Sequence, residues 1–145
     1  MQSRFMAIIR PYKDSDFEDY AGTLLQTWPF KNIQEARENV AEGVKRAEAK
    51  GEEIWVAEVD GTAAGFIIIE FTKDWSDGGE SFKDETVCID WFDVNPKFQQ
   101  KGIGKELLLK AEERGRERGL HQISMNTSIK NVQMMNFASK NGFKS

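Results

Sequence analysis

Hydrophobic residues along the chain follow two kinds of pattern, short runs of strand length and longer segments with helical spacing. Runs rich in β-branched and aromatic residues occupy residues 6–10, 54–59, 63–71, 86–94 and 122–127. Apolar residues recur every third or fourth position in residues 14–25, 34–50, 104–118 and 131–141. The first pattern predicts strands, and the second predicts amphipathic helices.

The turns between these segments carry signals of their own. Asp60-Gly61 reads as a hairpin turn between two predicted strands, and Asn95-Pro96 ends the strand over residues 86–94. A glycine directly follows each of the last three helical segments. The predicted order is β-α-α-β-β-β-α-β-α, which indicates one mixed α/β domain over residues 1–145 with an antiparallel meander in its middle.

Composition narrows the possible functions. The formal net charge of -4 gives no attraction to a phosphate backbone, so we expect no nucleic-acid partner. Cys88 and His121 are the single cysteine and histidine, too few for a zinc site or a Ser-His triad, and we expect no bound metal. The longest apolar run, residues 63–69, is too short to cross a membrane, and the N-terminus lacks a secretory signal. We therefore expect a cytoplasmic protein without a membrane partner.

The segment from residue 88 to residue 104 has the features of an anion-binding site. A strand ends at Val94, a proline-containing turn follows, and Gly102-Ile103-Gly104 opens a long helix. The first amides of a helix have no intrahelical acceptors and lie at the positive end of its dipole. Glycines leave the backbone open to a phosphate, and lysines at positions 97, 101 and 105 add positive charge.

Two other phosphate-binding motifs do not fit this segment. A Walker loop requires G-x-x-x-x-G-K-S/T, whereas Glu106 follows Lys105 and the first glycine is missing. A dinucleotide-binding fingerprint requires a third glycine where this chain has Leu107.

The segment from Val94-Asn95-Pro96 to Gln99-x-x-Gly102-x-Gly104 resembles the pyrophosphate-binding motif of the GNAT superfamily of N-acetyltransferases. Residues 131–143 resemble the second acetyl-CoA segment of that family, and the resemblance covers nearly the whole chain. It implies the GNAT fold, a mixed and mostly antiparallel central sheet flanked by helices. The implied activity is acetyl transfer from acetyl-CoA to a primary amine of a small molecule or a protein.

The resemblance also assigns roles to particular residues. The backbone of Phe92, Asp93 and Val94 is expected to pair with the pantetheine arm, with the Phe92 amide polarising the thioester carbonyl. The pyrophosphate and the cofactor arm are expected to be held by Gln99, Gln100, Lys101, Gly102, Ile103, Gly104, Lys105, Asn131 and Phe137.

The chemistry requires a base, because a lysine-like amine has a pKa of about 10.4 and must lose a proton before it attacks. Asp90 is two residues from Phe92, so strict alternation predicts that the two share a face of the strand. Asp90 is the first choice for the base, and Glu70 on the neighbouring strand is the second. Four aromatic residues are candidates for lining an acceptor pocket, namely Trp28, Phe30, Trp75 and Trp91, with core packing the alternative for Trp91.

Two features depart from the family pattern. Ala138 stands where the family often has a tyrosine as general acid, so a CoA-binding regulatory module without turnover is the alternative function. The family normally adds one or two strands after the position of Ser145, and their loss would expose a sheet edge. We therefore expect a truncated domain or one completed by another chain, for which a homodimer is the candidate.

Overall fold

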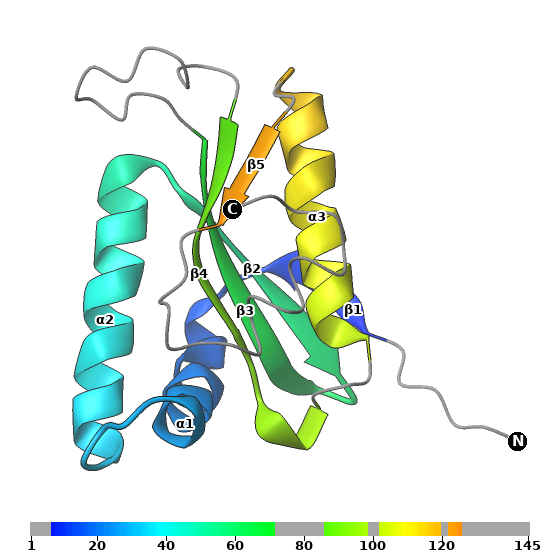
Figure 1. The fold of residues 1–145 in the computed structure, drawn as a ribbon. Helices are drawn as coiled ribbons and strands as arrows, with labels where there is room; N and C mark the ends of the chain where they lie inside the picture. Colours follow the sequence, from blue (N-terminus) through cyan, green and yellow to red (C-terminus); the bar gives the residue numbers. More distant parts are fainter. Residues whose placement is uncertain (1–6, 72–85, 99–101, 120–121, 126–145) are drawn as a thin grey trace, which may run out of the picture.

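The computed structural model describes residues 7–71, 86–98, 102–119 and 122–125 of the chain. Its sheet has the order β1-β2-β3-β4-β5, with bounds β1 Ile8–Pro11, β2 Glu53–Val59, β3 Thr62–Phe71, β4 Thr86–Val94 and β5 Gln122–Met125. Neighbouring strands are antiparallel from β1 to β4, whereas β4 and β5 are parallel. The predicted mixed, mostly antiparallel sheet is therefore confirmed (Figure 1).

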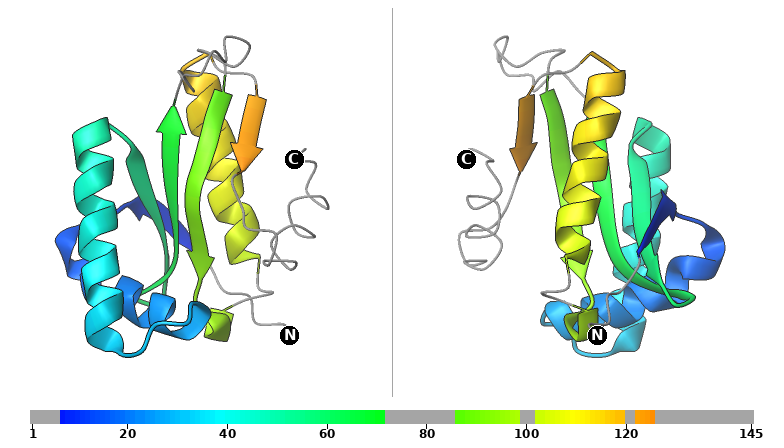
Figure 2. Two further views of the ribbon diagram at one scale, coloured as in Figure 1. Left: turned by 60° about the vertical axis from the view of Figure 1, so that its left-hand side comes forward. Right: turned by 90° about the vertical axis from the view of Figure 1, so that its right-hand side faces the viewer.

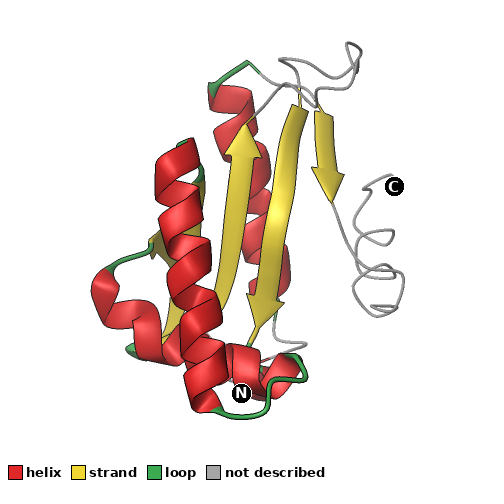
Figure 3. Cartoon of the chain, turned by 90° about the vertical axis from the view of Figure 1, so that its left-hand side faces the viewer, coloured by secondary structure: helices red, strands yellow, loops and turns green. Residues whose placement is uncertain are grey.

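Two helices cover one face of this sheet and a third helix covers the other face (Figures 2 and 3). The helices are α1 Phe17–Thr27, α2 Ile33–Lys50 and α3 Ile103–Glu117, with short 3-10 turns η1 at Asp14–Asp16 and η3 at Pro96–Phe98. The helix predicted from residue 14 is thus divided into η1 and α1. Among the described helices, none is long and apolar enough to cross a membrane.

Local sequence signals account for several of these boundaries. The Asn32 side chain accepts a hydrogen bond of 2.9 Å from the Glu35 amide, which caps the start of α2. Gly51, with a φ of 73°, ends α2 in the left-handed conformation that glycine adopts without strain. Asp60 and Gly61 have φ values of 52° and 80°, as a type I′ hairpin turn requires.

The sheet separates two hydrophobic clusters. On the α3 side, Ile67 and Ile69 of β3 pack with Leu107 and Ala111 of α3. On the α1–α2 side, Phe66 of β3 packs with residues of both helices. β3 is buried on both faces, which explains its almost wholly apolar sequence.

Close packing between β3 and α3 positions the start of α3. A Cβ placed on Gly65 would lie 3.0 Å from Leu107 Cδ1 and 3.2 Å from Ile103 Cγ2. The missing side chain therefore lets the first turns of α3 lie against the sheet. Gly65 pairs with Val94, so α3 begins next to the end of β4.

Candidate active site

A bulge in β4 changes the predicted geometry of this strand. The register with β3 passes from Ile89 to Trp91 and skips Asp90, which is therefore an inserted residue. Ile89 and Phe92 both pack in the α3-side cluster, whereas Trp91 packs on the α1–α2 side. The prediction that Asp90 and Phe92 share a face is wrong, because the inserted residue breaks the alternation on which it depended.

Three carboxylates meet beside this bulge. Glu52, Glu70 and Asp90 each contribute an oxygen atom, and these oxygens lie within 4.8 Å of one another. Glu70 follows Ile69, which is buried in the α3-side cluster, so alternation along β3 turns Glu70 toward the α1–α2 side. The structure thus brings together the two carboxylates that the sequence suggested as bases and adds a third.

Glu52 is the member of this carboxylate cluster that the sequence did not indicate. It follows Gly51 in the turn between α2 and β2, and its amide donates a hydrogen bond of 2.9 Å to the Ala47 carbonyl. Both of its carboxylate oxygens are buried and receive no hydrogen bond from an N–H group of the described residues, whereas the Asp90 carboxyl group lies close enough to share a proton with Glu52. Burial, followed by the negative charges of Asp90 and Glu70, raises the pKa of Glu52 to about 7. A carboxyl group with such a pKa is suited to proton transfer near neutral pH.

An aromatic pair lies on the same face of the sheet. Trp28, which follows α1, stacks on Trp91 of β4 with ring centroids 5.4 Å apart. Trp28 Nε1 donates a hydrogen bond of 3.0 Å to Asp93 Oδ1, and Thr27 Oγ1 lies 3.2 Å from the same oxygen. Of the four aromatic residues suggested from the sequence for an acceptor pocket, Trp28 and Trp91 are in contact. Phe30 packs against the α1–α2-side cluster, and Trp75 lies outside the described residues.

Asp93 is a buried residue on β4. Its side chain is 6% exposed and points toward α1, so only its backbone remains as the predicted contact with the pantetheine arm. Burial raises the pKa of Asp93 to about 7, although the hydrogen bonds from Trp28 and Thr27 act in the opposite direction.

Asn95 fixes the turn that leads from β4 toward α3. Its amide donates to the Ala64 carbonyl at 2.8 Å, and its Oδ1 accepts from the Lys97 amide at 2.9 Å. Its Nδ2 donates to Thr23 Oγ1 of α1 at 3.3 Å. These bonds tie the turn both to the sheet and to α1.

The diphosphate site that the sequence predicts falls at the start of α3, whose described part begins at Gly102. Gly102 caps α3 with a φ of 85°, and its carbonyl accepts the bond of 3.1 Å from the Glu106 amide. The amides of residues 103–105 precede this bond and have no acceptor within the helix. A Cβ on Gly102 would meet no atom of the described residues within 4 Å, and Lys97 and Lys105 are exposed nearby in the sequence. Open space, unpaired helix donors and positive charge fit the diphosphate of CoA.

Several predicted site residues lie outside the described part of the chain. These are Gln99, Gln100, Lys101, Asn131 and Phe137, together with Ala138. The last described pair of residues between β4 and β5 is Ile89 with Met125. The roles of the Phe92 amide and of the Val94 backbone toward the pantetheine arm stay predictions.

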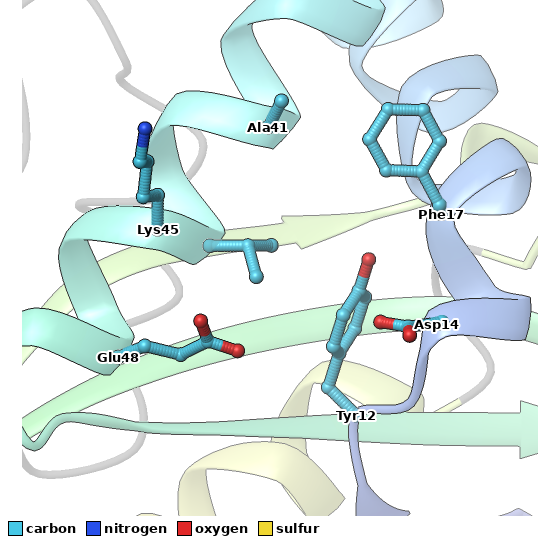
Figure 4. A pocket seen from close by; sticks show the side chains of 7 residues that line it. Tyr12, Asp14, Phe17, Ala41, Lys45 and Glu48 are labelled. Carbon is cyan, nitrogen blue, oxygen red and sulfur yellow. The ribbon is translucent and has the colours of Figure 1, made fainter.

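A separate groove lies between η1, α1 and α2 (Figure 4). It has a volume of about 390 Å³ and is lined by Tyr12, Asp14, Phe17, Ala41, Val44, Lys45 and Glu48. Burial, together with the charges of Asp16, Asp14 and Glu48, raises the pKa of Tyr12 to about 12. No lining residue comes from β4 or α3, so the groove is distinct from the carboxylate cluster and from the start of α3.

Known proteins share this sequence pattern and fold. An aminoglycoside N(6')-acetyltransferase type 1 of Salmonella enteritidis is 27% identical over 124 residues, which make up 86% of this chain and 82% of that protein. The structure of the aminoglycoside N-acetyltransferase AAC(6')-Iy in complex with CoA superimposes with a TM-score of 0.76 at 23% identity and covers 100% of this chain and 92% of that one. Its complex with a bisubstrate analog, CoA-S-monomethyl-acetylneamine, gives a TM-score of 0.74 at 24% identity, covering 97% and 92%.

The model of the Acetyltransferase (GNAT) family matches residues 8–143, which include the carboxylate cluster, β4 and the whole of α3. The resemblance noted in the sequence is thereby confirmed. The chain belongs to the Acetyltransferase (GNAT) family and is an acetyl-CoA-dependent N-acetyltransferase.

Proposed function

We propose that this enzyme acetylates a small, multiply charged amine of the aminoglycoside kind, and that the cluster of Glu52, Glu70 and Asp90 receives the reacting ammonium group. The observation that carries the proposal is the position of this cluster, which adjoins the bulge of β4. No described lysine or arginine forms an ion pair with any of the three carboxylates. A cluster of negative charge without an internal counter-ion favours a cationic ligand.

The acceptor class is supported by the relatives. Two proteins with 27% and 26% identity, each over 124 residues, are aminoglycoside N(6')-acetyltransferases from Salmonella. An aminoglycoside carries several ammonium groups, and a cluster of carboxylates attracts such a molecule more strongly than it attracts a monoamine. The acidic net charge of the chain acts in the same direction.

Glu52 is the group in the cluster best suited to act as the base. With a pKa of about 7, it is partly ionised at neutral pH and can still hold the proton that it accepts. The ammonium proton passes to the Glu52 carboxylate, directly or through a water, and leaves a neutral amine that can attack. The side chains of Asp90 and Glu70 lie beside it and hold the ammonium group in place before the transfer.

The start of α3 supplies the other half of the site. Bound acetyl-CoA supplies the acetyl group as a thioester, and the amides of residues 103–105 with Lys105 would hold its diphosphate. Phe92 is proposed to donate its amide to the thioester carbonyl, as the family resemblance implies. A thiol has a pKa of about 8.5, so the departing thiolate is readily protonated even with Ala138 at the position of the usual acid.

The proposal is tested by measuring CoA thiol release with three acceptors, namely an aminoglycoside, a simple monoamine and a peptide whose amines are its N-terminus and one lysine. We expect the highest kcat/KM for the aminoglycoside and a decrease of this value as salt screens the cluster. The Glu70→Gln variant should raise the KM of the aminoglycoside more than that of the monoamine. Glu42→Gln, at an exposed carboxylate of α2, is the matched control. A peptide or monoamine preferred over the aminoglycoside would contradict the proposal.

A further inference from the structure

Asp93 connects the end of α1 to β4 across a long distance in the sequence. Its Oδ1 accepts the Trp28 indole N–H at 3.0 Å and lies 3.2 Å from Thr27 Oγ1. Its Oδ2 is buried and receives no hydrogen bond of normal geometry within the described part of the chain, although the buried Trp91 indole also acts on this carboxyl group as a donor. A buried and half-satisfied carboxylate is unfavourable for folding. What this carboxyl group does in the structure is to hold the Trp28 indole and the Thr27 hydroxyl at the end of α1.

The residue that Asp93 holds lies at the surface. Trp28 is 36% exposed and follows the last residue of α1, where the backbone is already extended. Its amide donates to the Leu24 carbonyl at 2.8 Å, which fixes the backbone but leaves the ring free to rotate about its side-chain bonds. The bond from Nε1 to Asp93 removes that freedom, because the planar indole must then present its N–H edge to β4.

The held ring completes an aromatic surface next to the carboxylate cluster. Trp28 and Trp91 stack with an interplanar angle of 24°. Trp91 directly follows Asp90, the cluster member in the bulge, and both lie on the α1–α2 side of the sheet. An ammonium group over a tryptophan face is attracted by the ring, and tryptophan is the side chain best suited to this contact.

We propose that Asp93 is a positioning residue for the acceptor: it fixes Trp28 against Trp91, so that the two indoles form one face of the acceptor site beside the carboxylate cluster. This inference rests on the proposed function, because it requires a cationic acceptor at that cluster. Asp93 acts through Trp28 and does not itself touch the reacting atoms.

Three substitutions test this role. Asp93→Leu removes the acceptor of the indole N–H, Asp93→Asn retains an oxygen that can accept it, and Trp28→Phe retains a ring but removes the N–H. We expect Asp93→Leu and Trp28→Phe to raise the KM of the aminoglycoside by roughly 3- to 30-fold, the range of one cation–π contact. The KM of acetyl-CoA should stay within about twofold, and Asp93→Asn should stay close to the wild type.

The double variant Asp93→Leu/Trp28→Phe separates a shared role from two independent roles. If Asp93 acts through Trp28, the double variant should be no worse than the poorer single variant. Additive losses would overturn the inference, as would Asp93→Asn being as impaired as Asp93→Leu. If Asp93→Leu does not fold, Trp28→Phe at the half-exposed ring still tests the claim through its acceptor KM.

Circular dichroism gives a readout that does not depend on turnover. Stacked indoles produce an exciton couplet, which Trp28→Phe should abolish, Asp93→Leu should weaken and Asp93→Asn should keep. A wild-type enzyme that acetylates no cationic acceptor would contradict the proposed function. An active wild type whose acceptor KM is unchanged in Asp93→Leu and Trp28→Phe would contradict this inference alone.

Discussion

Glu52 and Asp90 place carboxylate oxygens within 4.8 Å of each other, although one lies in the turn after α2 and the other in the bulge of β4. Two carboxylates this close cannot both ionise without repulsion, so one of them holds a proton to a higher pH than usual. Burial first, and then the negative charge of Asp90, raises the pKa of Glu52. The face of the sheet next to β4 therefore carries a carboxyl group that titrates near neutral pH, as the proposed proton transfer requires.

Removal of the Asp90 charge should lower the pKa of Glu52, because that charge is the second-largest cause of the increase after burial. The acidic limb of the kcat/KM profile should therefore move to lower pH in Asp90→Asn. The profile is measured by thiol release with a fixed acceptor between pH 5 and 9. A limb that stays in place or moves to higher pH would show that Asp90 does not act on the titrating group.

Gly102→Ala should weaken acetyl-CoA binding. The substitution imposes a left-handed conformation on alanine, at a cost of about 1–2 kcal/mol, and places a methyl group in the open space before the helix amides. We expect the KM of acetyl-CoA to rise by about tenfold or more, which corresponds to the loss of one charge-assisted hydrogen bond.

Gly61→Ala is the matched control for this change. Gly61 also has a positive φ and open space, but it lies in the hairpin between β2 and β3. It should lose similar stability without any change in the KM of acetyl-CoA. Equal effects of the two substitutions on this KM would argue against a diphosphate site at the start of α3.

The sequence predicted most of the fold because its signals are local. The β4 bounds, the end of α2 at Gly51 and the Asp60-Gly61 turn all follow from residues that act on their immediate neighbours. The glycines at the start of α3 were identified for the same reason, since a left-handed residue before a helix needs no distant partner.

The parts that the sequence did not predict depend on distant contacts. Glu52 follows a helix in the chain. It comes close to Asp90 only because β2 pairs with β3 and β3 pairs with β4. No residue near Asp90 signals the bulge in the sequence. Strict alternation therefore predicted that Asp90 and Phe92 lie on the same face of the strand. The bond between Trp28 and Asp93 likewise joins segments that no periodicity relates.

Gly65→Val should destabilise the fold and displace the start of α3. Its Cβ would already lie 3.0 Å from Leu107 and 3.2 Å from Ile103, and the added methyl groups would deepen this overlap. Overpacking of this kind costs about 1–3 kcal/mol, which urea denaturation would reveal. We also expect a higher KM for acetyl-CoA. Gly43→Ala, in the middle of α2 with nothing within 4 Å, should instead gain about 0.5–1 kcal/mol. A neutral Gly65→Val would contradict the packing described for β3 and α3.

Asp93→Asn should change how stability depends on pH. The folded wild type keeps the Asp93 proton up to a pH of about 7, whereas the unfolded chain releases it near a pKa of about 3.9. Between these values folding takes up a proton, so the free energy of unfolding falls as pH rises, by about 1.4 kcal/mol per pH unit for full coupling. Asparagine cannot titrate, so the variant should gain stability relative to the wild type between pH 5 and pH 7. Urea denaturation at several pH values measures the difference, and parallel pH profiles would refute the raised pKa of Asp93.

The most direct test of the account is the pH profile of kcat/KM for an aminoglycoside in the wild type and in Glu52→Gln, with Glu42→Gln as control. In the wild type, kcat/KM should fall on the acidic side of about pH 7, the pKa of Glu52. This acidic limb should be absent in Glu52→Gln. The kcat/KM of this variant should fall by about 10²- to 10⁴-fold, the usual contribution of a general base. A Glu52→Gln enzyme with wild-type activity and an unchanged acidic limb would show that the carboxylate cluster does not deprotonate the acceptor.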